Sequence, residues 1–372
     1  MTAEIAILNK LAVALATDSA VTISAGKQEQ KIYDSADKLF DLSPANPIGI
    51  MIYNGMQFMQ APLPLLISEY RHECREFATV RDAAQDFLRF LNDWAAGSPA
   101  QVTRHALASI IGPALEIIQN NISSKINEIV REGITDDIGD RVEQAVDTII
   151  GNIERNIENA DKSQFVGGGA PRITKARKEI IRSIVADFWE GGDDDLIDRL
   201  TKLAIGLLLV RVPSPNYTGI VIAGFGSTEK FPSLISFKID GVVFDRLKFI
   251  ETDFVDIDRA GDKARVIPFA QSEMVERFLF GLDSTIQRDM ERFVKETVPE
   301  IRTHILSQLD MSDEDKKSLT KKARAAERAF IDGLKSEMFE EIRSSYRSEI
   351  EGMVEFMPKP ELAKMAEALI RA

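Results

Sequence analysis

The chain has 372 residues, of which 44% are hydrophobic and 28% are charged, an ordinary globular composition with length enough for one large domain or two modest ones. Its 46 Lys and Arg against 59 Asp and Glu give a net charge of −13, which argues against a general grip on nucleic-acid phosphates or anionic lipid. The single cysteine, Cys74, excludes an intramolecular disulfide framework and a multi-cysteine zinc site. We therefore expect no nucleic-acid partner and no metal.

The start of the chain gives no sign of export. Met1-Thr2-Ala3-Glu4 lacks the basic region and long apolar core of a signal peptide. The longest apolar run, residues 203–210, is far shorter than a membrane span. We expect a cytoplasmic protein without a membrane partner.

Strand-like runs come first in the chain. Residues 5–8 and 11–15 are short apolar runs joined at Asn9-Lys10, which predicts a tight hairpin because Asn tolerates positive φ. Both strands are expected to be buried on both faces. Residues 38–42 and 48–53 predict two further strands.

Helical periodicity follows from Gly55 for roughly 150 residues, with apolar positions such as Phe87, Leu88 and Leu91 at helical spacing. Strand character then returns in four segments: 217–224, 233–239, 246–250 and 264–267. From Gln271 onward the pattern is helical and highly charged, as on solvated faces.

This order of strands, helices, strands and helices predicts an α+β fold with two stacked sheets, helices outside them and a helical insertion. A Rossmann fold is excluded because the strands and helices do not alternate strictly. Its glycine fingerprint is also missing, since Gly224-Phe225-Gly226 lacks the third spaced glycine.

Thr2 is the residue with the clearest chemical potential. Removal of Met1 would leave a hydroxyl and a free α-amine on one residue, and an α-amine titrating near pH 8 can accept the hydroxyl proton. Asp18 ends the second strand of the hairpin that begins at Thr2, and Lys38 opens the third strand. A lysine beside the nucleophile would lower its pKa, with the aspartate orienting that lysine. A surface Asp–Lys pair at a sheet edge is the simpler alternative.

These residues carry a family resemblance. Thr2, together with the segments 13–20, 38–40, 219–226 and 232–241, resembles the proteasome β-type subunits, including bacterial peptidase subunits that partner unfolding ATPases. The resemblance covers residues 2–60 and 217–283. It implies a four-layer αββα N-terminal-nucleophile hydrolase fold, without a cofactor.

The resemblance also implies roles for single residues. Thr2 would be the nucleophile, and Asp18 and Lys38 would activate it. Gly55 would donate a backbone N–H to the oxyanion, although it also suits a strand-to-helix turn that needs a permissive φ. Ser272 corresponds to a family serine, but it lacks the flanking glycines and equally suits a helix cap.

The expected domains follow from this comparison. Residues 1–60 and 211–310 would form the proteasome-like core, 61–210 a helical insertion, and 311–372 C-terminal helices. The insertion is longer than the family's pair of helices, and the chain ends in helix where the family continues into further strands with an active-site aspartate and serine.

Two functions remain open. The first is a threonine peptidase that cleaves peptide bonds, acts on protein or peptide substrates and assembles as a homo-oligomer; the resemblance leaves room for an ATP-dependent unfolding partner. The second is a catalytically inactive scaffold that binds partner proteins through its helical insertion. No phosphate-binding loop of an ATPase is present.

Other candidate residues have structural interpretations. His72, His105 and His304 lack partners at i+4, so packing or surface roles are expected rather than metal binding. The run Asp193-Asp194-Asp195 is expected to cap a helix that begins near Leu196.

Overall fold

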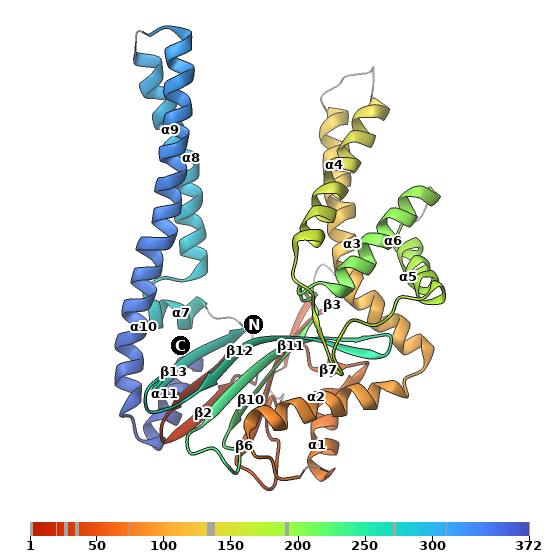
Figure 1. Cartoon of the computed structure of the whole chain (residues 1–372), viewed down its shortest axis with the longest axis vertical. Helices are drawn as coiled ribbons and strands as arrows, with labels where there is room; N and C mark the ends of the chain where they lie inside the picture. Colours follow the sequence, from red (N-terminus) through yellow and green to blue (C-terminus); the bar gives the residue numbers. More distant parts are fainter. Residues whose placement is uncertain are drawn as a thin grey trace. The chain divides into compact units, whose positions relative to one another are not determined.

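The computed structural model describes residues 3–19, 21–25, 29–33, 37–73, 75–131, 138–189, 193–270, 273–309 and 311–371. The fold is mixed α/β with antiparallel sheets (Figure 1). It divides into two compact units, of which one joins residues 1–36 to 257–372 and the other holds residues 37–256. The expected core, residues 1–60 with 211–310, is therefore shared between the units, because the N-terminal hairpin pairs with a strand beyond residue 257.

A three-stranded sheet, ordered β13-β1-β2, organises the first unit. Its strands are β1 (Ala3–Asn9), β2 (Ala12–Thr17) and β13 (Ala264–Ala270). The predicted hairpin is confirmed, but its turn does not rest on a positive φ. Instead, Asn9 Oδ1 accepts hydrogen bonds from the N–H groups of Leu11 and Ala12, at 2.9 and 3.1 Å, as in an Asx turn.

Helices cover one face of this sheet. Ile5 and Ile7 of β1 pack with Val266 of β13 against α7 (Glu273–Phe280), α10 (Glu340–Glu355) and α11 (Lys359–Arg371). β1 is buried along its described side chains, as expected. β2 is only half-buried beyond Ala12, so the expectation of burial on both of its faces is wrong. As an edge strand, it has a neighbouring strand on one side only.

A second hairpin in this unit was not predicted. β3 (Val21–Ala25) pairs with β4 (Glu29–Tyr33), with Val21 opposite Tyr33. The signal in the sequence is weak: Val21, Thr22 and Ile23 precede Gly26, and Ile32 and Tyr33 follow it. Polar residues separate these short runs.

A six-stranded antiparallel sheet, ordered β5-β6-β10-β11-β12-β9, organises the unit of residues 37–256. Its strands are β5 (Leu39–Asp41), β6 (Ile48–Asn54), β9 (Gln164–Phe165), β10 (Thr218–Gly224), β11 (Ser233–Val243) and β12 (Arg246–Asp256). The strands expected at these places are confirmed, and β11 and β12 run longer than predicted.

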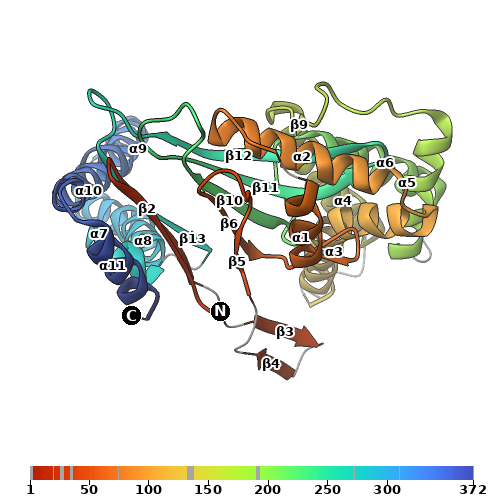
Figure 2. The ribbon, with the colours of Figure 1, turned by 90° about the horizontal axis from the view of Figure 1, so that it is seen from below.

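Two helices, α1 (Leu63–Glu73) and α2 (Val80–Ala96), lie on one face of this sheet (Figure 2). The apolar side chains of that face alternate along each strand, for example Ile50 and Ile52 of β6 and Ile220 and Ile222 of β10. α1 and α2 lie within the expected insertion, yet they pack as part of the sheet's own core.

Four further helices form a second cluster in the same unit: α3 (Ala100–Arg131), α4 (Ile138–Asn159), α5 (Lys175–Phe188) and α6 (Asp194–Leu209). Asp193 caps α6 as predicted, because its carboxylate accepts the N–H of Leu196 at 2.7 Å. The helical block is thus confirmed, with the short strands β7 (Gln57–Phe58), β8 (Ala61–Pro62) and β9 among its helices.

The rest of the first unit is helical. α8 (Ser284–Gln308) runs antiparallel to α9 (Asp313–Gly333), which continues through a π-helical turn, η1 (Leu334–Phe339), into α10. We call α8, α9 and η1 the arm. Among the described residues beyond 270 there is no strand, in agreement with the helical prediction.

Candidate functional site

The five predicted site residues divide between the two units. Thr2 and Ser272 lie outside the described residues. Asp18 belongs to the unit that contains β1 and β2, whereas Lys38 and Gly55 belong to the unit of residues 37–256.

One end of the three-stranded sheet gathers the neighbours of the predicted nucleophile. Glu4 of β1 is opposite Thr17 of β2, and Ala3 is opposite Ala270 of β13. Asp18 follows Thr17 directly and is half-buried. The start of β1 and the ends of β2 and β13 therefore lie at the same end of the sheet, and Asp18 lies there too.

Glu4 is a buried acid at this edge that the sequence analysis missed. It is 1% exposed, and one of its carboxylate oxygens accepts a hydrogen bond from Thr17 Oγ1 at 3.4 Å. The same hydroxyl is 3.0 Å from the carbonyl oxygen of Asp18. The only signal in the sequence is a single acid directly before the apolar run Ile5–Leu8, and a charged side chain is almost never fully buried unless it is paired.

Lys38 and Gly55 lie at one end of the β5–β6 pair. The carbonyl of Lys38 accepts the N–H of Ile52 at 2.9 Å, and Leu39 is opposite Met51. The Lys38 side chain is 2% exposed. Gly55 follows the last residue of β6 directly.

The turn at Gly55 is tightly held. Asn54 adopts a φ of +62°, and its side-chain amide donates to the carbonyls of Pro215 and Tyr217, at 3.2 and 2.6 Å. A Cβ at position 55 would lie 2.3 Å from Thr218 Oγ1. Glycine is required here by this close approach, while the permissive φ expected of Gly55 belongs to Asn54.

A buried ion pair supports the segment that holds this turn. Lys248 Nζ of β12 lies 2.9 Å from Asp240 Oδ2 of β11, and the two side chains are 1% and 2% exposed. Lys248 also donates to the carbonyl of Val212 at 2.9 Å, and Asp240 Oδ1 accepts the N–H of Ser214 at 2.8 Å. The pair therefore fixes residues 212–214, just before Pro215 and Tyr217. Sequence reasoning missed it because its members belong to different strands.

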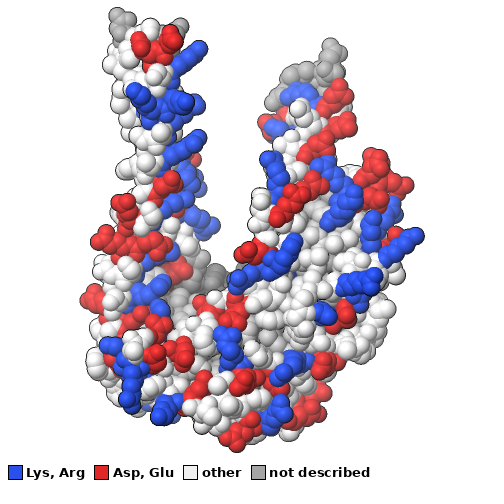
Figure 3. All heavy atoms as spheres, viewed as in Figure 1, with Lys and Arg blue, Asp and Glu red and all other residues white. Residues whose placement is uncertain are grey.

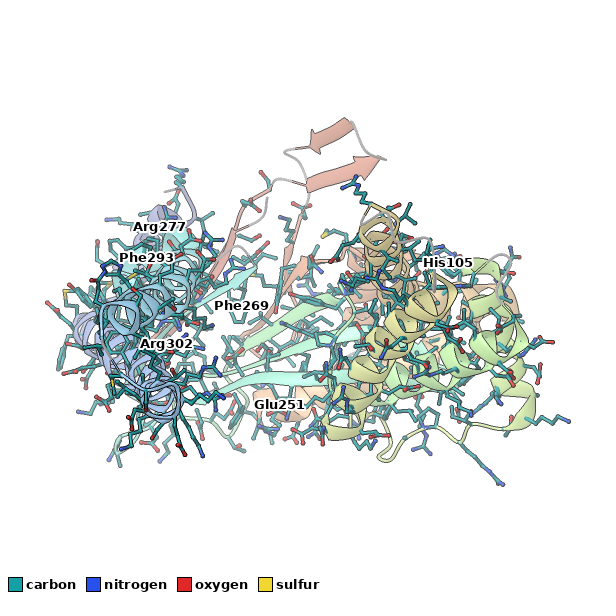
Figure 4. All side chains as sticks on the ribbon, turned by 90° about the horizontal axis from the view of Figure 1, so that it is seen from above. His105, Glu251, Phe269, Arg277, Phe293 and Arg302 are labelled. Carbon is teal, nitrogen blue, oxygen red and sulfur yellow. The ribbon has the colours of Figure 1, made fainter. Side chains whose placement is uncertain are left out.

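A cavity of about 220 Å³ opens beside Thr218. It lies between the β7–β8 turn, the first turns of α3 and the Ile239–Gly241 segment of β11. Polar groups in its lining include Gln57, His105 and Asp240; His105, labelled in Figure 4, is exposed. This is smaller than the roughly 300–1,000 Å³ of a typical small-molecule pocket.

The backbone around this cavity is strained. Met59 and Gln60, which form the two-residue turn between β7 and β8, have φ values of +49° and +67°. Such a turn prefers Asn or Gly, so non-glycine residues here cost about 1 kcal/mol each. Backbone strain of this kind is concentrated at functional sites in proteins.

Comparisons with known protein families, curated proteins and solved structures find no match to this chain. In the part of the chain that the structure describes, no three His, Cys, Asp or Glu side chains gather as metal ligands. None of the described helices is long and apolar enough to cross a membrane.

Proposed function

We propose that the chain is a threonine-type N-terminal-nucleophile hydrolase that cleaves peptide bonds through Thr2. The observation that carries this proposal is the edge of the three-stranded sheet. Thr2 directly precedes Ala3, which is opposite Ala270, and Asp18 directly follows Thr17, which is opposite Glu4. This register supports a nucleophile and an acid at the same edge, as the resemblance to proteasome β-type subunits implies.

In the proposed reaction, the α-amine of Thr2 accepts the proton of its own hydroxyl, and Oγ forms a bond to the peptide carbonyl carbon. Lys38, oriented by Asp18, lowers the pKa of the nucleophile. The N–H of Gly55 stabilises the oxyanion, a contribution worth about 3 kcal/mol of barrier. The C–N bond then breaks, the leaving amine takes the proton, and water hydrolyses the acyl-enzyme. Ser272 would assist at the same edge.

The four-layer fold is part of the same proposal. Each sheet carries helices on one face and apolar residues on the other. In β1, Ile5 and Ile7 face the helices, so Ala6 and Leu8 lie on the opposite face. In β6, Ile50 and Ile52 face α1 and α2, which leaves Met51 on the opposite face. We infer that the two apolar faces stack in an αββα sandwich.

The proposed setting is the cytoplasm, with protein or peptide substrates, a homo-oligomeric enzyme and room for an ATP-dependent unfolding partner. Nucleic acid and membranes are not proposed as partners. The net charge of −13 supports the exclusion of nucleic acid.

A catalytically inactive scaffold is the second candidate, and one observation favours it. The described residues after β13 form only helices and connections, whereas the family resembled here continues into strands that carry further active-site residues. A scaffold would bind partner proteins through the helical insertion, residues 61–210.

Intact-mass spectrometry before and after treatment with a β-lactone separates the two candidates. The hydrolase is expected to lose Met1 and gain a single adduct, which Thr2→Ala abolishes and Lys38→Met strongly slows while circular dichroism stays unchanged. A matched control, Thr22→Ala, should label normally. Retained Met1, or a processed chain without an adduct, would refute the hydrolase and leave the scaffold.

A further inference from the structure

The arm exposes large apolar side chains on a helix that buries none. No residue of α8 is buried. Yet Met290, Phe293, Ile301 and Ile305 are 37%, 66%, 52% and 54% exposed. Steps of three, four and eight residues keep such side chains along one side of a helix. Single exposed apolar residues are ordinary on protein surfaces, but a row of them marks an interaction surface.

The second helix of the arm adds to the same row. Phe330 of α9 and Met338 of η1 are 56% and 45% exposed. Arg302 of α8 and Glu327 of α9 form an ion pair, so these two side chains face each other across the arm. Phe330 comes three positions after Glu327, and Ile301 comes one position before Arg302. Seen along its own helix from the N-terminus, each of these two apolar residues is rotated away from the ion pair in the same direction, Phe330 by about 60° and Ile301 by about 100°. In an antiparallel pair, this puts both residues on one flank, which we call the apolar flank.

Two ion pairs join α8 to α9 and η1, and apolar side chains of the two helices such as Val294, Val298 and Ile331 are half-buried. Arg302 Nη1 lies 2.6 Å from Glu327, and Lys335 Nζ lies 3.0 Å from Glu291. Phe293 and Arg302 are labelled on the arm in Figure 4. A two-helix hairpin has no room for a core of its own, and bundles gain one by adding further helices.

We propose that the apolar flank binds the same flank of a second copy of this chain, so that two arms form a four-helix bundle. The size is sufficient: α8 is about 37 Å long, and two helices packed side by side are about 20 Å wide. Two arms paired along the whole of α8 would therefore share a face of about 740 Å² each, close to the roughly 800 Å² that each partner buries in a standard stable interface.

The net charge of the chain favours a second copy over an anionic lipid surface. Lys317, Lys321, Arg324 and Arg328 form a basic row along α9, and Lys and Arg are prominent on the outer part of the arm in Figure 3. Phe330 comes two positions after Arg328, so it points about 200° away around the helix. A helix that lies on an anionic lipid surface also has its basic side chains on the face opposite the apolar one, so the basic row does not separate the two partners. The net charge of −13 does, because it repels an anionic surface. A second copy needs only the apolar flank and leaves the basic row in water.

The test is the mass of the full chain in solution, measured by light scattering and analytical ultracentrifugation across a concentration series. Wild type is expected to contain an even number of chains. Phe293→Glu combined with Ile301→Glu should halve that mass or raise the dissociation constant at least about tenfold. The matched control is Ile117→Glu on α3, which alters a 55% exposed isoleucine outside the arm and should leave the mass unchanged.

Because the altered residues are exposed, the variants should keep the wild-type circular dichroism, and their melting temperature should match that of wild type diluted below its dissociation constant. A monomeric wild type at about 100 μM, or a double variant that keeps the wild-type mass, would overturn the proposal. So would a monomer that binds anionic phosphatidylserine vesicles through these two residues, since the flank would then be a lipid site. β-Lactone labelling at Thr2 is independent of every one of these outcomes.

Discussion

The two long helical hairpins of this chain, α3–α4 and α8–α9, differ in how many of their side chains they bury. α3 and α4 are held by α5 and α6, and α3 alone buries eight residues, including Leu107, Ile111 and Leu115. α8 and α9 are of similar length, but α8 buries none and is joined to α9 and η1 through ion pairs. Helix length and periodicity therefore do not reveal whether a hairpin has its core within the chain or must find it elsewhere.

The difference lies in what surrounds each hairpin. Isolated helices are marginal in water, and most helical stability in proteins comes from packing of the apolar side. For the α3–α4 hairpin that packing lies within residues 37–256, where α5 and α6 share its apolar cluster. For the arm it is incomplete, which is why we assign its apolar flank to a second copy.

The largest loss of stability is expected from breaking the buried Lys248–Asp240 ion pair, which holds residues 212–214 between α6 and β10. Lys248→Met leaves Asp240 as a buried charge without its ion-pair partner, which should lower the free energy of unfolding by about 3–5 kcal/mol. Urea denaturation measures this loss. Adding Asp240→Leu should recover much of it, because an apolar pair can replace a buried ion pair. A single variant as stable as wild type would contradict this account.

The second-largest effect is expected when one buried residue of α3 and one exposed residue of α8 are truncated in turn. Ile111→Ala empties a fully buried position in α3 and should cost about 2–5 kcal/mol. Ile301→Ala on the arm should change the stability of the monomer by less than about 0.5 kcal/mol. Both are measured by urea denaturation at a concentration low enough to keep the chain monomeric. Equal losses would show that the arm has a core of its own.

A smaller effect concerns the start of the arm. Asp283 caps α8 by accepting the N–H groups of Thr285 and Ile286, at 2.7 and 2.9 Å. Asp283→Ala should cost about 1 kcal/mol, whereas Asp283→Asn, which keeps a capping oxygen, should cost less. Thermal melts of the two variants provide the measurement, and equal losses would argue against capping.

The same residue gives the arm a pH dependence. A hydrogen bond from Arg277, and then those from the backbone, hold the pKa of Asp283 below its usual range. The stabilisation is therefore complete above the unfolded pKa of about 3.9 and is lost as the pH falls through the lower, folded pKa. Wild type should lose more stability than Asp283→Ala in that acid range.

The smallest effect is a gain. Every described non-glycine residue with positive φ belongs to the unit of residues 37–256, and none belongs to the arm. Gln60→Gly relieves one of them and should stabilise the chain by up to about 1 kcal/mol. Gln57→Gly, in the neighbouring strand, should instead destabilise it. A loss of stability in Gln60→Gly would show that its side chain contributes more than its strain costs.

Much of the fold could be predicted because its strands carry local signals. Runs such as Ile48–Tyr53 and Gly219–Ala223 are short, apolar and rich in β-branched residues, and they form β6 and β10. β3 and β4 were missed because polar residues interrupt their alternation. The pairing of β1 with β13, which unites residue 3 with residue 270, depends on contacts between distant parts of the chain that no local pattern records.

The candidate site was predictable only in part. Thr2, Asp18 and Lys38 could be named because their residue types suit one chemistry. Glu4, the Asp240–Lys248 pair and the Asn54 turn could not be, since their roles come from burial and from partners far along the chain. The same sequence signal, an apolar helical row, describes both buried α3 and exposed α8.

The π-helical turn at Leu334–Phe339 changes the rotational phase between the two ends of one long helix, which runs from α9 into α10. Such a turn holds one residue more than an α-helical turn, so the side chains beyond it are rotated relative to those before it. The outer end can therefore face α8 while the inner end turns Val354 into the apolar cluster under the three-stranded sheet. Deleting a single residue from this turn would rephase the helix, and only one of its ends could then keep its neighbours.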